Sequence, residues 1–247
     1  MPNHIANKLV VESDKKDEIK RFLDFIKGDN KKEVIDFNTI IPMPNIIKET
    51  ESSSKTDLSV YYYLYMSGKQ DIIPKILRFH SIYKIYDIIK NHKQEELDEY
   101  YLNGKKYYNI YLETGSHTWY EWSNNNWGTK WNAYDSNLIH SIENKAIISF
   151  NTAWNGVPNL ISKLVELFPN IQFEYKFADE DICHNCGVGD GNAEDGFFFH
   201  YCQSNSNEAM ETYAECWDEE IDEFIQLPNG CWTKKEWLED EDEEEEL

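Results

Sequence analysis

Two segments far apart in the chain repeat one pattern, a strand followed by a helix with a single apolar stripe, and this repeat constrains the fold most. Residues 5–12 and 145–152 read as the two strands, each with apolar side chains on one face. The stripe residues are Ile19, Phe22, Leu23 and Ile26 in the first helix and Ile161, Leu164, Val165 and Phe168 in the second. Because each stripe must be buried, both helices are expected to pack on a sheet.

A further strand is expected after each helix. Residues 34–41 read as extended and end at the two prolines of Ile41–Pro44, and residues 171–177 alternate apolar and polar side chains. Two such βαβ units that fold together give a four-stranded antiparallel sheet with its helices on one face. The sequence therefore predicts an α+β protein with the ferredoxin-like split βαβ sandwich.

An insertion separates the two units. Residues 58–92 are rich in aromatic side chains and isoleucine, and Pro74 suits the first turn of a buried helix. Residues 100–111 place Asn103-Gly104 between tyrosine-rich flanks, which predicts a β-hairpin with a type I′ turn. The insertion is thus expected to be part helical and part hairpin.

The expected organisation has five parts. After the second unit we expect a strand at 197–202 and a helix that carries Met210 and Tyr213 on one face. The parts are a first βαβ half at 1–57, the insertion at 58–112, a tryptophan-rich segment with the second βαβ half at 113–205, a C-terminal helical extension at 206–238, and an acidic tail at 239–247.

The tryptophan-rich segment, residues 114–135, is the strongest candidate for a functional surface. It holds four of the eight tryptophans, interleaved with asparagines and a Gly-Thr-Lys step. Large rings among turn-forming residues are typical of a platform with its polar edges turned outward. The candidate binding residues are Trp119, Trp122, Asn126, Trp127, Gly128, Thr129, Lys130, Trp131, Asn132, Tyr134 and Asp135.

Within this segment we expect Trp127 and Trp131 to be mostly buried and to hold a tight surface turn. Gly128 is expected to permit that turn through a backbone angle that side chains disfavour. Two roles remain open for Lys130. It either pairs internally with a carboxylate such as Asp135 or Glu121, or presents its charge to a partner.

The charge balance limits the choice of partners. The chain has 46 acidic and 24 basic residues, a net charge of −22. Such a field repels nucleic acid and anionic membranes and attracts basic surfaces, so the expected partner is a protein with a basic surface. No apolar run is long enough for a membrane span, and the start of the chain lacks a secretory pattern. We therefore expect a cytoplasmic protein.

The cysteines allow two interpretations. Five cysteines without a secretory pattern argue against a disulfide framework. Cys183 and Cys186 form a Cys-x-x-Cys step, and His200 with Cys202 follows on the next expected strand, so a zinc-stabilised module is one hypothesis. Ordinary buried thiols are the other. No cofactor is expected, with zinc as the alternative.

A carboxylate cluster, Asp179–Asp181, stands at the end of an expected strand. Paired carboxylates bind divalent cations or perform acid–base catalysis, which makes a metal-dependent hydrolase or nuclease-like enzyme the alternative function. The sequence contains no nucleophile elbow, phosphate-binding loop, dinucleotide fingerprint or HExxH zinc motif. The main expectation is therefore a protein without enzymatic activity.

Several segments together resemble the YubB-type ferredoxin-like family of plasmid- and phage-encoded proteins. The matching segments read MPNHIANKLVV at the start, IIPMP at 40–44, WYEWSNNNWGTKWNAYD at 119–135, FNTAWNGVP at 150–158 and FADED at 177–181. The resemblance implies a ferredoxin-like domain on a mobile element in a bacterial host, and it implies no activity. With the negative charge, it suggests an accessory protein that binds another protein and inhibits a host defence system such as a CRISPR or restriction nuclease.

Overall fold

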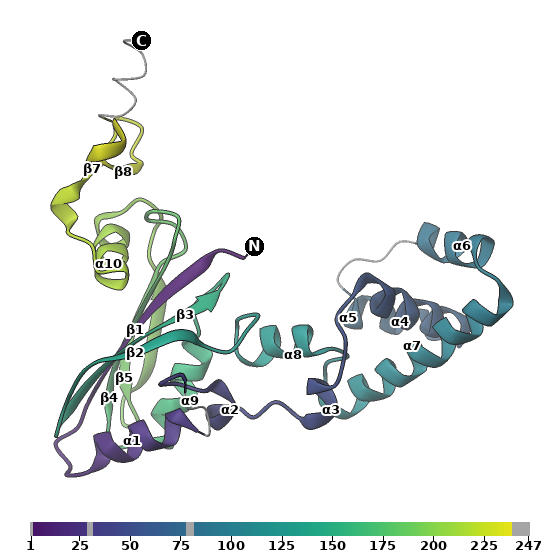
Figure 1. Cartoon of the computed structure of the whole chain (residues 1–247), viewed down its shortest axis with the longest axis horizontal. Coiled ribbons are helices and arrows are strands. Elements are labelled where there is room, and N and C mark those ends of the chain that lie inside the picture. Colours follow the sequence, from purple (N-terminus) through teal and green to yellow (C-terminus); the bar gives the residue numbers. More distant parts are fainter. Residues whose placement is uncertain (1, 29–31, 78–81, 239–247) are drawn as a thin grey trace. The chain divides into compact units, whose positions relative to one another are not determined.

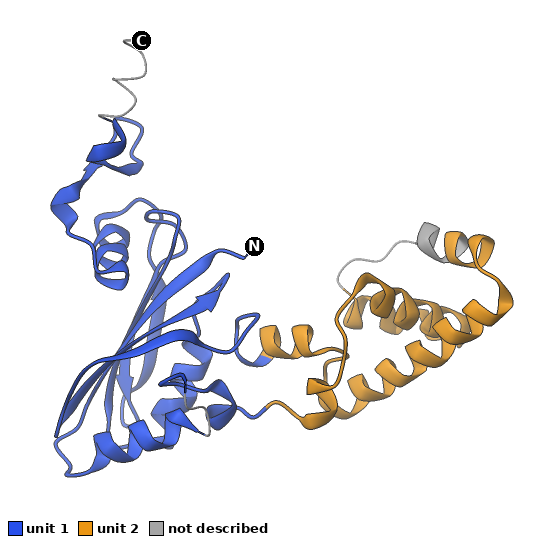
Figure 2. Ribbon diagram, in the orientation of Figure 1, with its two compact units in different colours: residues 1–42, 126–247 blue, residues 43–125 orange. Residues whose placement is uncertain are grey.

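The computed structural model describes residues 2–28, 32–77 and 82–238. The chain forms two compact units, shown in different colours in Figure 2: unit 1 comprises residues 1–42 and 126–247, and unit 2 comprises residues 43–125. Unit 2 contains the expected insertion at 58–112 and extends it at both ends. The expected acidic tail at 239–247 lies outside the described residues.

Unit 1 is built on an antiparallel sheet (Figure 1). The sheet has six strands in the order β2-β3-β1-β4-β5-β6. The central strand β1 pairs with β3 and β4, so Leu9 lies between Ile148 and Tyr175. The strands are β1 (His4–Glu12), β2 (Tyr134–Ile142), β3 (Lys145–Ala153), β4 (Gln172–Asp179), β5 (Gly187–Asn192) and β6 (Gly196–Tyr201).

Two helices, α1 (Glu18–Lys27) and α9 (Pro158–Leu167), pack on the same face of this sheet. The ring of Phe22 lies 5.2 Å from that of Phe168 and 5.8 Å from that of Phe173 on β4, all in edge-to-face contacts. The two apolar stripes therefore share one core, as predicted. Apart from α2 and the helices of unit 2, which lie between α1 and β2, the elements follow the order β1-α1-β2-β3-α9-β4. The α+β ferredoxin-like fold is thereby confirmed.

The opposite face of the sheet carries α10 (Asn207–Trp217). Its Glu215 forms ion pairs with Lys8 and Lys176, whose side chains leave the sheet on the face away from Tyr175. The expected C-terminal helical extension is this helix followed by a short 3-10 helix, η2 (Ile221–Glu223), and by a two-stranded sheet, β7 (Phe224–Gln226) and β8 (Trp232–Lys234).

The strand expected at 34–41 is wrong, because this segment contains the short helix α2 (Phe37–Ile40). Asp36 caps that helix by accepting a hydrogen bond from the backbone N–H of Asn38. The second strand of the fold is β2, which immediately precedes β3. Most side chains of β2 are exposed, since it is an edge strand, so it lacks the apolar alternation of a buried strand.

Unit 2 is helical throughout its described part. Its core is rich in tyrosine, with Tyr61, Tyr62 and Tyr63 of α4 against Tyr107 and Tyr108 of α7. The elements are α3 (Asn45–Lys48), α4 (Ser54–Met66), η1 (Gln70–Ile72), α5 (Ile73–Ile76), α6 (Ile82–Asn91), α7 (Gln94–Thr114) and α8 (Trp119–Asn126). Among the described residues no helix is long and apolar enough to cross a membrane.

The hairpin expected at 100–111 is also wrong, because these residues lie inside α7. Gly104 serves helix packing and forms no turn: a Cβ atom there would lie 2.0 Å from the backbone oxygen of Ser59 on α4. Asn103 donates a side-chain hydrogen bond to the Ser59 hydroxyl at 3.3 Å. The Asn-Gly pair thus marks a close approach of two helix backbones.

Candidate functional site

The turn of the tryptophan-rich segment is fastened to the end of β3. Gly128 has φ +82°, so the predicted left-handed angle is confirmed. The hydroxyl of Thr129 donates to the carbonyl oxygen of Ala153 at 2.8 Å and accepts the Ala153 N–H at 3.0 Å. This reciprocal pair fixes the next residue, Lys130, beside the last residues of the strand.

Lys130 contacts two indole rings. Its ammonium nitrogen is 4.7 Å from the ring centroid of Trp131 and 4.9 Å from that of Trp154, both within cation–π distance. Trp154 follows β3 with φ +72°, and its N–H donates to the carbonyl oxygen of Asn3. The exposed fractions are 39% for Trp131 and 42% for Trp154, so both rings reach the surface. We call these three residues the indole–lysine cluster.

The burial of the two tryptophans in the turn differs from expectation at one position. Trp127 is buried, as predicted, and its indole N–H donates to the carbonyl oxygen of Ile41 at 2.9 Å. Its ring makes an edge-to-face contact with Phe37. The prediction that Trp131 is mostly buried is wrong, because its ring packs over the Lys130 side chain at the surface.

A network of side-chain amides and carboxylates adjoins Trp154. The carboxylate of Asp179 accepts from the Asn3 amide at 3.0 Å, from the Asn185 amide at 3.2 Å and from the Asp181 N–H at 3.1 Å. Asn185 also donates to the carbonyl oxygen of Trp154. These bonds tie together the start of the chain, the end of β3 and the loop after β4. Both carboxylate oxygens of Asp179 accept hydrogen bonds in this network.

Asn132 has a local structural role. Its side-chain oxygen accepts the backbone N–H groups of Phe37 and Ala133, at 2.8 and 2.9 Å. Its amide donates to the carboxylate of Asp36 at 2.7 Å. The side chain therefore joins the turn to the capped start of α2.

Tyr134 links the cluster to β1. Its hydroxyl donates to the carbonyl oxygen of Thr152 at 3.0 Å, so the 2.8 Å contact with His4 is a bond donated by the Nδ1–H of His4. Burial, reinforced by the charge of Asp135, raises the pKa of Tyr134 to about 12. The ring also meets Trp131 edge to face. Tyr134 is thus a neutral support beside the exposed indole.

The remaining tryptophans of the segment belong to α8. Trp122 is buried, and the backbone N–H of Trp119 donates to the Thr50 hydroxyl at 2.8 Å. Asn126 ends this helix. The structure therefore brings Lys130, Trp131 and Tyr134 together and places Trp119 and Trp122 in unit 2. Asp135 is exposed at the start of β2 with φ +50°.

Comparison with known proteins identifies the domain that carries the cluster. Residues 126–223 match the family model described as "Ferredoxin-like domain in Api92-like protein". The matched residues contain β2 to β6, α9 and α10, and with β1 and α1 they form the ferredoxin-like fold of unit 1. The chain is also similar to a crystal structure of a protein api92 from Yersinia pseudotuberculosis, with 9% identity, a TM-score of 0.41, and coverage of 82% of this chain and 99% of that one. No curated protein matches it.

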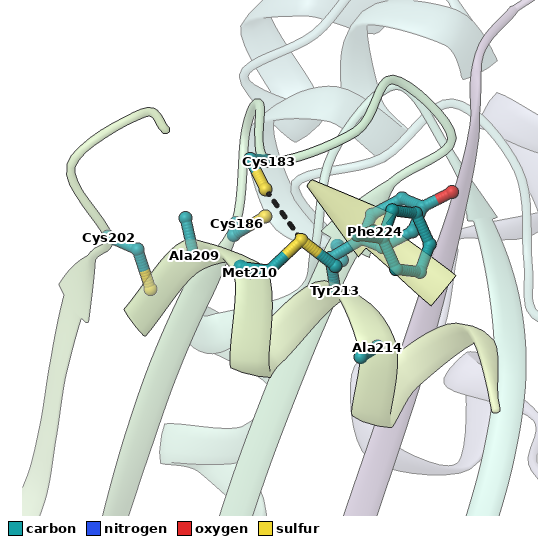
Figure 3. Close-up of a cluster of buried hydrophobic side chains, with 9 residues drawn as sticks. Cys183, Cys186, Cys202, Ala209, Met210, Tyr213, Ala214 and Phe224 are labelled. Carbon is teal, nitrogen blue, oxygen red and sulfur yellow. Dashed lines mark hydrogen bonds between the residues drawn. The ribbon is translucent and has the colours of Figure 1, made fainter. Parts of the chain in front are cut away.

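Within the ferredoxin-like domain, three of the candidate zinc ligands lie in an apolar cluster (Figure 3). Cys183, Cys186 and Cys202 are buried beside α10, and the Cys183 thiol lies 3.4 Å from the sulfur of Met210. Burial raises the pKa of Cys183 and of Cys186 to about 12, so both are neutral thiols at physiological pH. The fourth candidate, His200, is exposed and bonds to a carboxylate on α10.

Across residues 2–28, 32–77 and 82–238, no group of three or more His, Cys, Asp or Glu side chains is arranged to hold a metal ion. The Asp179–Asp181 carboxylates form no such group. The zinc and hydrolase interpretations stay predictions.

Unit 2 contains one buried ionic group that the sequence did not reveal. His117 bonds through Nδ1 to Glu121 at 2.6 Å and through Nε2 to Asp57 on α4 at 3.0 Å, beside a pocket of about 200 Å³. Burial is the largest influence and lowers the pKa of His117, but the two carboxylates together raise it to about 9. Because both nitrogens then donate, the imidazolium ties α4 to α8 and is not available as a base. Its only sequence signal is the i, i+4 spacing to Glu121.

Proposed function

We propose that the chain is a non-enzymatic accessory protein that acts by binding another protein through the indole–lysine cluster. One observation carries this proposal: two tryptophans, each about two-fifths exposed, both lie within 5 Å of the Lys130 ammonium group. Monomeric proteins rarely expose large rings at adjacent positions, and tryptophan is strongly enriched among the residues that dominate binding energy at interfaces.

The geometry of the cluster supports binding because the rings are already ordered. The Thr129–Ala153 hydrogen bonds hold the turn, and the cation–π contacts of Lys130 restrict the rotamers of both indoles. A side chain that is immobilised before binding loses less entropy on binding, by about 0.5–1.5 kcal/mol for each flexible side chain. The cluster thus offers a rigid apolar contact with a positive centre.

The overall charge supports a basic partner. A net charge of −22 attracts basic surfaces over long distances and speeds association with them. The specific form of the proposal is that the protein occupies a basic nucleic-acid channel in a host defence system, such as a CRISPR or restriction nuclease. The resemblance to proteins of plasmids and phages supports this form, and the bacterial cytoplasm is the corresponding location.

The surroundings of the carboxylate cluster favour binding over catalysis. Both oxygens of Asp179 accept N–H donors that hold the chain start and the loop after β4 in place. Removal of these carboxylates is therefore expected to loosen the structure. The cysteines likewise pack as neutral thiols against Met210, so we propose that no cofactor is needed.

Capture from bacterial lysate tests the binding function. The wild-type protein, the Trp131→Ala/Trp154→Ala variant and a Trp237→Ala control are immobilised and compared at low and moderate salt. Trp237 is also an exposed tryptophan, so the control matches the loss of an indole away from the cluster. We expect a basic nucleic-acid-handling protein to be retained by the wild type and the control and lost by the double variant. Retention of the same proteins by all three would contradict the proposal.

The enzymatic alternative has its own test. Purified protein is incubated with nucleic-acid and phosphoester substrates in magnesium or manganese, beside an Asp179→Ala/Asp181→Ala variant. We expect no turnover above the buffer rate. Turnover that is abolished in a double variant with the circular dichroism spectrum and melting temperature of the wild type would support a metal-dependent hydrolase. Stoichiometric zinc in elemental analysis of the purified protein would support the zinc-stabilised module.

A further inference from the structure

Strand β6 forms one outer edge of the sheet, and within the described parts of the chain no strand pairs with its outer side. Its sequence, Gly-Phe-Phe-Phe-His-Tyr, carries no lysine or proline, the residues that commonly protect a sheet edge. Phe198 is 68% exposed, and Tyr201 is more than half exposed. An apolar edge of this kind is able to accept another strand.

The pairing of β6 with β5 shows which backbone groups face outward. The N–H of Cys202 donates to the carbonyl oxygen of Cys186, immediately beyond the pair Tyr201–Gly187. In an antiparallel pair, alternate residues direct both backbone groups to the partner strand and the residues between direct both away. Phe197, Phe199 and Tyr201 therefore present their N–H and C=O groups at the open edge.

The same residues wall a groove of about 410 Å³ on the side of the sheet that α9 covers. The other wall is mixed: Asn159 and Ser162 of α9 are polar, and Trp127, Gly128 and Pro158 add apolar surface. The rings of Phe197 and Phe199 stack at an interplanar angle of 18° and lie over the glycines of β5, where a Cβ atom on Gly189 would come within 2.8 Å of the Phe197 ring. The aromatic wall is thus firmly packed, with room beside it for apolar side chains.

The opposite side of this edge is acidic. Asp190 lies across from Phe198 on that side, and Glu208 of α10 bonds to His200. The surrounding sequence, residues 177–233, contains fourteen aspartates and glutamates and no lysine or arginine. A strand that pairs with β6 would therefore meet an aromatic groove with one set of alternate side chains and a negative surface with the other.

We propose that β6 is a docking edge for an extended, basic peptide segment of a partner protein, which adds to the sheet as a seventh strand. Main-chain hydrogen bonds to Phe197, Phe199 and Tyr201 supply affinity, and alternation of apolar and basic residues in the segment supplies specificity. The groove borders the turn that carries Lys130, at Trp127 and Gly128, but the contact proposed here uses the open backbone edge of β6. The inference therefore does not depend on the function proposed for the indole–lysine cluster.

A synthetic peptide in which valine and lysine alternate is the probe. Its binding is measured by fluorescence anisotropy for the wild type, Tyr201→Ala and Tyr201→Pro; the two variants lose the same side chain, but only proline removes the outward N–H. We expect the proline variant to bind about fivefold more weakly than the alanine variant, the effect of one lost hydrogen bond. An Asp190→Asn variant is expected to weaken binding at low salt, and a peptide with glutamate in place of lysine is expected not to bind.

Amide hydrogen exchange locates the contact. The peptide is expected to slow exchange at Phe197 and Phe199 and to leave the other sheet edge, β2, unchanged. Equal binding by the two Tyr201 variants, or unchanged exchange at Phe197 and Phe199, would overturn the inference. Concentration-dependent protection of these amides without peptide would identify a second copy of this chain as the occupant, and would also overturn it.

Discussion

Replacement of Gly104 by alanine is expected to destabilise unit 2, although alanine is the better helix former. Gly104 lies inside α7, where a Cβ atom would meet the backbone oxygen of Ser59 at 2.0 Å and the Cβ of Tyr63 at 2.7 Å. Carbon and oxygen atoms in contact are normally more than 3 Å apart. The obstacle is helix backbone, which cannot rotate away, so α4 and α7 would have to separate.

The two opposing effects differ in size. Glycine to alanine in an exposed helix interior gains about 1 kcal/mol of helix propensity. Overpacking of a well-packed core costs about 1–3 kcal/mol, and an overlap of more than 1 Å with backbone belongs at the upper end of that range. The expected net loss is therefore about 2 kcal/mol, which corresponds to a melting temperature roughly 10 °C lower for a unit of this size.

Thermal and urea unfolding followed by far-ultraviolet circular dichroism would measure this change, since unit 2 is helical. Leu102→Ala on the same helix is the control: Leu102 is exposed, so little change is expected. A Gly104→Ala variant that is as stable as the wild type, or more stable, would refute the close helix contact and with it our account of the Asn-Gly pair.

Three further predictions concern the core, the buried histidine and the thiols. Phe22→Ala should lower the free energy of unfolding by about 3–5 kcal/mol, because the ring is buried between both helices and the sheet; a loss below about 1 kcal/mol would contradict the shared core. The pKa of His117 is raised from 6.5 to about 9, so below pH 6.5 its ion pairs make their full contribution to the stability of the folded protein. That stability, about 3 kcal/mol, is lost as the pH rises through 9, and unfolding curves of His117→Gln should lack this loss. Burial raises the pKa of Cys183 to about 12, so a thiol reagent should modify the exposed Cys231 first and Cys183 only after denaturant is added; equal rates for the two would argue against a buried cluster.

The helices of the fold could be predicted because a buried stripe leaves a clear pattern. Phe22 belongs to the apolar stripe of the first helix and Phe168 to that of the second. The two rings are in contact in one core. Gly128 could be predicted because a turn that needs positive φ strongly prefers glycine. In each case a local sequence rule and the tertiary structure require the same residue.

Other features depended on contacts between distant residues. Strand β2 is an exposed edge and has no apolar alternation, and Gly104 serves contact with Ser59 on another helix. Trp154 joins the candidate site only because Thr129 bonds to Ala153, the last residue of β3. Its one local signal is an isolated tryptophan directly after a strand, before Asn155-Gly156. Such pairings across the fold leave little trace in a single sequence.

The affinity of the captured partner for the indole–lysine cluster tests the central proposal most directly. Isothermal titration of the purified partner would compare wild type, Trp131→Ala, Trp154→Ala, Lys130→Ala and the Trp237→Ala control. Interface tryptophans commonly contribute 2 kcal/mol or more, so each cluster tryptophan is expected to weaken binding by about 30-fold or more. Lys130→Ala should also weaken binding. Because it removes the cation–π contacts with both indoles, it should lower the free energy of unfolding by at most about 2 kcal/mol. The Trp237→Ala control should bind as the wild type does. Unchanged affinity in both cluster tryptophan variants would contradict the proposal that this surface binds the partner.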